Sequence, residues 1–461
     1  MTLASAFDFP LTAPWQVRRV TQRPINHILT NTGCWSPDGQ WILYDLRSDL
    51  EGTLFDSPAI ERVHSATGEV ESLFLGKRGA KVGVVTHSPC DGRIVFIHGP
   101  AAPTSDWAYS ATHRHGCIVD SQVRPPRLTE GGVILDARDL APPFTSGALR
   151  GGTHLHTFSG DGHRVSSTYQ DAVLEMLSQQ PTAPIHDLDQ RNVAVSVRFD
   201  GGVVPKSTHP HNQSGAYWTT LVTHTVNHPQ WGSDEICRAF SDAWIGQNGY
   251  LRADGSRQHY AIAFQGELRS RTGVPLVEAF VVDLPDDEAA FRIAGDLPLQ
   301  GTPFKRPAPP AGIAQRRISH TESHRFPGLA GPRHWPRSSP DGSRIALLKR
   351  DETGVVQIWL ISPLGGDLQQ LTSNPHDIAS AFSWSPNGAW ISHVMGGEIC
   401  VTNTHSGKTH ALTDLAASEL APSPLACVFS PCGTRIAYLQ PRIESTGETV
   451  NHIALVESLS T

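Results

Sequence analysis

The hydrophobic positions of this chain gather in short, β-rich runs, and each clear run begins just after a turn-forming phrase. Such runs bounded by Gly, Pro, Asn and Asp are typical of strands joined by tight turns. They favour many short strands over long helices. The clearest runs are Trp41–Leu46, Arg93–His98, Arg164–Tyr169, Arg344–Leu348, Trp390–Val394 and Arg435–Leu439.

The turn phrase itself recurs in six places, and its residue types explain the turn. Pro fixes φ, Asp or Asn tolerates the turn conformation, and Gly supplies a positive φ. The phrase therefore predicts a hairpin between two strands. Its clear copies are Trp35–Gly39, Ser339–Gly342, Trp384–Gly388 and Phe429–Gly433, and looser copies are His87–Gly92 and Phe158–Gly162.

The spacing of the phrase defines a repeat of four strands. Ser339, Ser385 and Ser430 are 46 and 45 positions apart. A third strand follows the run after each phrase, as in Val356–Ile361 and Glu398–Thr402, and a fourth ends in a Leu-Thr pair. Four strands in roughly 45 residues are typical of a propeller blade. The Leu-Thr pairs are Leu371-Thr372, Leu412-Thr413 and Leu128-Thr129.

The stretch between Ser159 and Ser339 has no clean phrase. We place a third blade there up to about Ser207, and then an irregular fourth blade with an insertion over residues 227–255. Ser233–Phe240, inside the insertion, has a plausible N-cap and is predicted to form a short helix. The expected strands of the fourth blade are Trp218–Thr225, His259–Phe264, Glu278–Leu284 and Gln315–Ile318.

The sequence thus predicts an all-β, seven-bladed β-propeller that occupies residues 1–461 as a single domain. The last blade has strands around Leu425, at Arg435–Leu439 and at His452–Val456. Near the start of the chain, Gln16–Thr21 resembles the fourth-strand ending Leu368–Thr372. We expect this N-terminal strand to complete the last blade, which leaves no open sheet edge.

Composition narrows the class of protein. The formal charge of −7, with no basic stretch, argues against a general nucleic-acid binder. The chain shows neither a signal peptide nor an apolar run long enough to span a bilayer. Its seven cysteines contain no CxxC pair and are expected to be reduced thiols. We therefore expect a cytoplasmic protein that does not bind membranes.

Particular phrases carry a resemblance to known families. The repeats resemble those of the TolB-like propellers over nearly the whole chain. Within that group the phrases Leu149–His154, Pro332–Trp335 and Gly83–His87 resemble the uncharacterised enterobacterial YidR-type proteins. The chain is more distantly similar to oligogalacturonate lyase, a seven-bladed propeller with a similar repeat. That resemblance implies a divalent metal, typically manganese, held by histidines in the central channel. One propeller fold serves many functions, so the resemblance predicts fold more specifically than activity.

Polar residues recur where the innermost strand of each blade begins. Counted from the Trp35 position of the phrase, seven of the ten residues four and eight positions upstream are polar in the five clearer copies. Polar side chains from distant segments are thereby expected to converge on the propeller axis. The residues four positions upstream are Asn31, His154, His334, Ser380 and Leu425, and those eight upstream are His27, Arg150, Ala330, His376 and Ala421.

A metal site is one hypothesis for this convergence. His154 and His156 are two residues apart, so strand alternation places both on one face. With His334 from another blade, and His211 as a fourth ligand, they could hold Mn, or alternatively Zn or Fe. The alternative is that these histidines are hydrogen-bonded packing residues.

Arg150 and Arg333 stand close to His154 and His334 in sequence. Guanidinium groups there suit a bidentate grip on the carboxylate of a uronate sugar. A buried structural pair with Asp or Glu is the alternative. The general base of an elimination is expected among His27, His87 and His376, although a structural role is open for each.

Two functions follow from these residues. The first is a metal-dependent lyase acting on a small acidic, uronate-type oligosaccharide at the channel mouth. The second is a non-catalytic propeller that binds a protein partner, as TolB does. Histidine and arginine at matching positions of several blades favour the enzyme, because a scaffold does not need them there.

Overall fold

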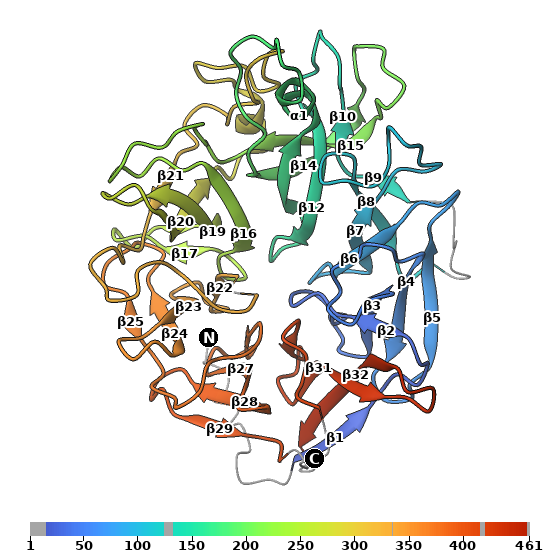
Figure 1. Cartoon of the computed structure of the whole chain (residues 1–461), viewed down its shortest axis with the longest axis vertical. Coiled ribbons are helices and arrows are strands. Elements are labelled where there is room, and N and C mark those ends of the chain that lie inside the picture. Colours follow the sequence, from blue (N-terminus) through green and yellow to red (C-terminus); the bar gives the residue numbers. More distant parts are fainter. Residues whose placement is uncertain (1–14, 124–131, 334, 415–419, 459–461) are drawn as a thin grey trace.

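The computed structural model describes residues 15–123, 132–333, 335–414 and 420–458. Within them, seven four-stranded antiparallel sheets are arranged as blades around a common axis (Figure 1). The predicted seven-bladed β-propeller is confirmed. Each blade runs outward from its innermost strand in sequence order, except that the last blade takes its outermost strand from the N-terminus.

The strands are grouped here by blade, from the innermost strand outward. Blade 1 contains β2 (Asn26–Ile28), β3 (Trp41–Arg47), β4 (Ala59–His64) and β5 (Val70–Leu75). Blade 2 contains β6 (Val82–His87), β7 (Arg93–His98), β8 (His115–Asp120) and β9 (Val133–Ile134). Blade 3 contains β12 (Gly151–Phe158), β13 (Arg164–Asp171), β14 (Asn192–Val203) and β15 (Gly215–Leu221). Blade 4 contains β16 (Arg238–Trp244), β19 (Tyr260–Arg269), β20 (Pro275–Leu284) and β21 (Gln315–Arg317). Blade 5 contains β22 (Arg337–Ser338), β23 (Ile345–Arg350), β24 (Val356–Ile361) and β25 (Gln369–Gln370). Blade 6 contains β26 (Ser383–Trp384), β27 (Trp390–Met395), β28 (Glu398–Asn403) and β29 (Thr409–Ala411). Blade 7 contains β30 (Cys427–Phe429), β31 (Arg435–Ile443), β32 (Thr449–Ser458) and β1 (Trp15–Arg19).

Few elements lie outside the blades. They are the two-stranded sheets β10 (Ala137–Arg138) with β11 (Ala148–Leu149) and β17 (Tyr250–Leu251) with β18 (Arg257–Gln258), the helix α1 (Ala172–Ser178), and a 3-10 helix, Glu288–Arg292. Asp171 caps α1, since its side chain accepts the N–H of Leu174. Among the residues that the structure describes, neither helix combines the length and apolar character that a membrane-spanning segment requires.

The turn phrase closes as its residue types predict. In the first copy the Ser36 hydroxyl donates to Asp38 Oδ1 at 2.5 Å and accepts the N–H of Trp41 at 2.9 Å. Gly39 has φ of +67°, which glycine adopts without strain. The same serine–carboxylate bond recurs at Ser339 and Asp341, at 2.6 Å. Each phrase therefore joins the innermost strand to the second strand at the same end of the blade.

Neighbouring blades are joined by apolar packing and by residues of the phrase. Between blades 7 and 1, the Arg435 guanidinium donates to the Gly39 carbonyl and the Ser65 hydroxyl, both at 2.8 Å, and lies 5.1 Å from the Trp35 ring centre. The Trp35 indole donates in turn to the Val428 carbonyl at 3.2 Å. The core of the molecule thus lies between blades rather than in a single centre.

The predicted closure by the N-terminal strand is confirmed. β1 pairs antiparallel with β32, with Val17 opposite Val456, and the two strands lie side by side at the rim in Figure 1. Just after β1, the Val20 N–H donates to the Ile453 carbonyl at 2.8 Å. The last blade therefore contains both ends of the described chain.

The third and fourth blades divide at a different point from the one predicted. Trp218 lies in β15, which is the outermost strand of blade 3 and not part of blade 4. The innermost strand of blade 4 is β16, within the stretch that was expected to be an insertion. The predicted helix over Ser233–Phe240 is wrong, because β16 begins at Arg238 and pairs with β19. Burial of Ala239 and Ala243 between the blades stabilises a strand there, against the local helix signal.

Candidate functional site

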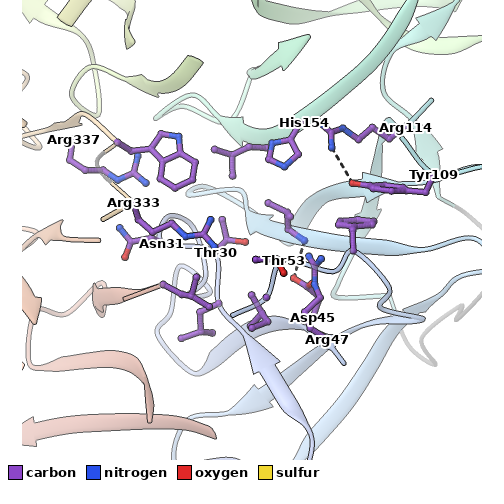
Figure 2. A pocket seen from close by; sticks show the side chains of 18 residues that line it. Thr30, Asn31, Asp45, Arg47, Thr53, Tyr109, Arg114, His154, Arg333 and Arg337 are labelled. Carbon is purple, nitrogen blue, oxygen red and sulfur yellow. Dashed lines mark hydrogen bonds and ion pairs between the residues drawn. The ribbon is translucent and has the colours of Figure 1, made fainter. Parts of the chain in front are cut away.

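A pocket of about 420 Å³ lies at the mouth of the propeller, where innermost strands begin. The loops that follow the second strands of blades 1 and 2 contribute part of its lining. Blade 5 contributes the opposite wall (Figure 2). Segments from residue 28 to residue 425 therefore meet in one pocket.

The charge of the pocket is strongly one-sided. Its lining includes four arginines and a single carboxylate, Asp45. Asp45 is buried and pairs with Arg47 at 2.6 Å. Across the described part of the chain, no ion pair links Arg114, Arg333 or Arg337 to a carboxylate. Three guanidinium groups thus remain to bind an anionic ligand.

Arg114 lies on the wall formed by blade 2, beside His154 (Figure 2). The residue is 8% exposed, and one guanidinium nitrogen donates to the Tyr109 hydroxyl at 3.1 Å. Its Nε is buried and has no hydrogen-bond partner within the described ranges. Burial lowers the pKa of Arg114, with Tyr109 acting in the opposite direction. An anion bound to Arg114 would supply the missing hydrogen-bond acceptor and would balance the unpaired positive charge.

Stacked rings hold the two loops of this wall together. The Phe55 and Tyr109 rings stack with centres 4.3 Å apart at an interplanar angle of 6°. The Arg47 guanidinium lies 4.5 Å from the Phe55 ring centre on the blade 1 side. Tyr109 then bonds Arg114 on the blade 2 side. This stack fixes Arg114 in place before any ligand binds.

The blade 5 wall carries the other two arginines. Burial lowers the pKa of Arg337 to about 10, with Asp242 acting in the opposite direction, so the group stays charged at neutral pH. Its Nε is buried without a hydrogen-bond partner among the described residues. Arg333 has φ of +47°, and burial, followed by the charge of Arg47, lowers its pKa. Both guanidinium groups line the pocket.

Backbone bulges shape the pocket floor. Val84 and Leu155 occupy equivalent positions of β6 and β12, and both have a left-handed φ, of +55° and +53°. Each lies where the pairing register shifts. Asp45 accepts the N–H of Val84 at 2.9 Å and so holds the first bulge. Such strain in branched residues is expected near functional sites, and here it turns both side chains into the pocket.

His154 is the predicted metal ligand that lines this pocket. Burial lowers its pKa well below 6.5, and the nearby charges of Arg114 and Arg191 lower it further. The imidazole is therefore neutral at physiological pH. A neutral imidazole can accept a proton or bind a metal ion.

Comparison with known proteins agrees with this architecture. A family described as "Protein of unknown function (DUF3748)" matches residues 81–213. Over 427 residues the chain is 44% identical to YidR of Escherichia coli K12, described as an uncharacterized protein, and this match covers 92% of the chain and 95% of that relative. The chain belongs to the YidR family. The predicted family resemblance is thereby confirmed.

Two solved structures are similar to this YidR-family protein. Oligogalacturonate lyase in complex with manganese matches with a TM-score of 0.55 and 13% identity, over 97% of this chain and 94% of that one. The putative TolB of Agrobacterium tumefaciens matches with a TM-score of 0.37 and 14% identity, over 97% and 99% of the two chains. At 13% identity the likeness to oligogalacturonate lyase shows the fold alone.

The other predicted ligands are not brought to His154. The bulge at Leu155 breaks strand alternation, so the prediction that His156 shares a face with His154 is wrong. His156 is fully buried and its Nε2 lies 2.9 Å from Thr153 Oγ1; burial, and then Arg114, lowers its pKa to about 3. His211 stacks on Trp107 at 4.0 Å in a separate cavity on the side of blades 2 and 3.

A metal therefore does not fit the described residues alone. His334 lies outside the residues that the structure describes. Within the described ranges, no group of three or more His, Cys, Asp or Glu side chains is placed to hold a metal ion.

The three predicted general bases lie outside the mouth pocket. His27 is buried, lies 2.9 Å from the Asn451 carbonyl through Nδ1, and has its pKa lowered to about 4 by burial. His87 lies at the far end of β6, where its Nδ1 is 2.9 Å from the Ser88 carbonyl and burial lowers its pKa. His376 is exposed in the loop between β25 and β26.

Of the two predicted carboxylate-binding arginines, one lines the pocket and one does not. Arg150 is fully buried and pairs with Asp171 at 2.5 Å, while it also donates to the Thr302 carbonyl. This is the structural alternative that its sequence position left open. Arg333 is placed in the pocket, as its position suggested.

Sequence reasoning missed most of the charged wall. Asp45 and Arg47 end the second strand of blade 1, and Tyr109 and Arg114 lie in the loop after the second strand of blade 2. In a propeller blade that end of the second strand is at the mouth as well. Searching these loops for charged residues would have found both arginines.

Proposed function

We propose that this protein is a lyase that acts on an acidic, uronate-type oligosaccharide bound in the mouth pocket. One observation carries the proposal: Arg114 is a buried guanidinium without a carboxylate partner, and it stands beside a neutral His154. A uronate supplies the missing anion. The shared propeller fold of oligogalacturonate lyase supports the reaction class.

The proposal gives each of these two side chains a role. Arg114 binds the sugar carboxylate and stabilises the negative charge that develops on it when the adjacent carbon loses its proton. His154 accepts that proton, and the C–H electron pair forms the new carbon–carbon double bond. The glycosidic C–O bond at the β carbon breaks, and the leaving oxygen takes a proton from water.

The neutral state of His154 gives this assignment a pH signature. Because burial and two arginines lower its pKa well below 6.5, the base form persists as the pH falls through 6.5. A free histidine base would lose activity there. We expect kcat/KM for the acidic oligosaccharide to stay constant from pH 7.5 down to 6.

The direct test is turnover of short oligogalacturonates, followed by the ultraviolet absorbance of the unsaturated uronate product. We expect His154→Ala and Arg114→Gln each to lower kcat/KM by about 100-fold or more. His376→Ala and Arg271→Gln are matched controls, since both residues are exposed and outside the pocket. Full activity in His154→Ala would contradict the assignment of the base.

The manganese hypothesis is the finer part of the proposal, and it rests on His154 together with His334. Metal analysis of the purified protein, repeated on His154→Ala, tests it apart from activity. Bound manganese, zinc or iron that is lost in the variant supports a metal at His154. If the wild-type protein contains no metal and still forms the unsaturated product, the manganese hypothesis is wrong and the lyase proposal is unaffected.

A further inference from the structure

The uncompensated charges of the mouth pocket stand on two separate walls. Arg114 and His154 lie on one side, and Arg333 and Arg337 lie on the other (Figure 2). Because Asp45 is already paired with Arg47, no lining carboxylate compensates either wall. A ligand with one anionic group would satisfy one wall and leave the other charged.

The blade 5 wall is built to face an anion. Arg337 Nε is buried with no hydrogen-bond partner among the described residues, and the nearby Asp242 does not approach within ion-pairing distance. Arg333 adopts a left-handed φ, which is unfavourable for a residue other than glycine. Neither the unpartnered Nε of Arg337 nor the left-handed backbone of Arg333 stabilises this wall when no ligand is bound.

The floor between the walls is largely uncharged. Val84 and Leu155 are turned into it by the bulges, and Leu425 adds apolar surface from blade 7. Asn31 is already engaged, since its amide donates to the Phe382 carbonyl at 2.8 Å and accepts the Cys427 N–H at 2.9 Å. The middle of the ligand therefore meets apolar groups and the hydroxyls of Thr30 and Thr53.

We infer that the ligand carries two anionic groups, one bound by Arg114 and the other by Arg333 and Arg337, with an uncharged ring between them. The inference rests on the proposed function only in that it places the ligand in the same pocket. The second anion can be a second uronate carboxylate or a phosphate on the same sugar. A planar carboxylate and a tetrahedral phosphate each offer two oxygen atoms to a guanidinium group, which binds them with two hydrogen bonds.

The test is calorimetric binding of matched probes to the full chain at one ionic strength. Digalacturonate carries two carboxylates, galacturonate carries one, and galactobiose carries none. Galacturonate 1-phosphate distinguishes a phosphate from a second uronate. We expect a dianionic probe to bind about 10- to 100-fold more tightly than galacturonate, and galactobiose not to bind.

Variants assign the two anions to their walls. Arg337→Gln and Arg333→Gln should each lower the affinity for the better dianion by about 10-fold and leave galacturonate binding unchanged. Arg114→Gln should weaken both ligands. Arg271→Gln is the control on an exposed arginine outside the pocket. As a whole residue Arg333 is exposed, although its guanidinium group lines the pocket, so its variant reports on binding even if the less exposed Arg337 variant folds poorly.

Each outcome decides between the two claims. Equal affinity for galacturonate and both dianions, or no effect in either blade 5 variant, overturns the two-anion inference. So does the absence of binding by every dianion. Tight, wall-dependent binding of a dianion without any unsaturated product overturns the lyase and leaves the inference standing. Formation of the unsaturated product by a protein that binds galacturonate as tightly as the probes with two anionic groups supports the lyase and overturns the two-anion inference.

Discussion

At the scale of single residues, some buried charged side chains around the channel lack close partners. Asp242 in β16 is 1% exposed, and neither carboxylate oxygen has a hydrogen-bond partner within bonding distance in the described part of the chain. Burial raises its pKa to about 6, although the neighbouring Ser166 hydroxyl and then the charges of Arg337 and Arg191 act against this. Its ionised form therefore destabilises the folded protein.

Asp242→Asn is expected to stabilise the protein in a pH-dependent way. The carboxyl pKa is 3.8 in the unfolded chain and about 6 in the folded one, so ionisation above pH 6 costs about 3 kcal/mol. Below pH 3.8 both states are protonated and the cost disappears. Urea unfolding at pH 4 and at pH 7.5 should show the variant gaining on the wild type as pH rises.

Asp200→Asn serves as the control for Asp242→Asn, because Asp200 is exposed. A stability difference between Asp242→Asn and wild type that stays the same at pH 4 and pH 7.5 would show that burial does not shift this carboxyl. The outcome also bears on the pocket, since Asp242 influences the charge of Arg337.

Which site residues the sequence could reveal depends on the repeat. His154 and Arg333 stand near the turn phrase of their blades, so alignment alone brought them to the mouth. Arg114 stands in the loop after the second strand of blade 2, outside the turn phrase, so alignment of the phrase carries no information about it. His156 was misplaced because no sequence pattern signals the left-handed Leu155 that breaks the alternation.

At the scale of the element, the bulge in β6 depends on a glycine. A Cβ at Gly83 would lie 2.6 Å from Asp45 Oδ2 and 2.9 Å from an Arg47 nitrogen. The ion pair that holds Val84 therefore occupies the space that a side chain would need. Only glycine fits beside it.

Gly83→Ala is accordingly expected to displace Asp45 and Arg47, to destabilise the fold by about 1–3 kcal/mol, and to weaken binding of the probe digalacturonate. Chemical denaturation and calorimetry measure the two effects. Gly295→Ala is the control, since its added Cβ meets nothing nearer than 3.7 Å. If both alanine variants behave alike, the close approach at Gly83 is not a constraint.

The arginine that follows the phrase joins one blade to the next. Arg435→Ala removes two hydrogen bonds to blade 1 and the contact with the Trp35 ring, so we expect a loss of about 1–3 kcal/mol in urea unfolding. Arg350→Ala removes a bond to Gly354 within its own hairpin and should cost little. An equal loss in both would argue that the link between blades is not special.

The blades were predictable wherever the phrase was intact, because its hairpin chemistry is local. The fourth blade was not, since its phrase is degenerate: Trp244 to Gly249 reads Trp-Ile-Gly-Gln-Asn-Gly. Trp244 still behaves like a phrase residue, donating to the Thr157 carbonyl of blade 3 at 3.0 Å. The small hairpin of β17 and β18 then separates it from its second strand, which hides the spacing.

At the scale of the whole molecule, the pocket exists only if the ring closes. Its walls come from blades 1, 2, 3, 5 and 7, so blade 7 must pack on blade 1 to complete it. One apolar cluster spans this junction and contains Val20, Ile28, Leu425 and Ile453. The closing strand and the pocket are therefore linked through shared packing.

A charge placed in this junction should open it. Val20 is 1% exposed and Val17, three residues earlier, is 45% exposed. Val20→Asp buries an unpaired carboxylate, so we expect the melting temperature to fall by about 5 °C or more and the affinity for the acidic ligand to fall with it. Val17→Asp makes the same chemical change at the surface and should leave both nearly unchanged. If Val20→Asp lowers the melting temperature but the folded variant binds the ligand with full affinity, closure stabilises the ring without shaping the pocket.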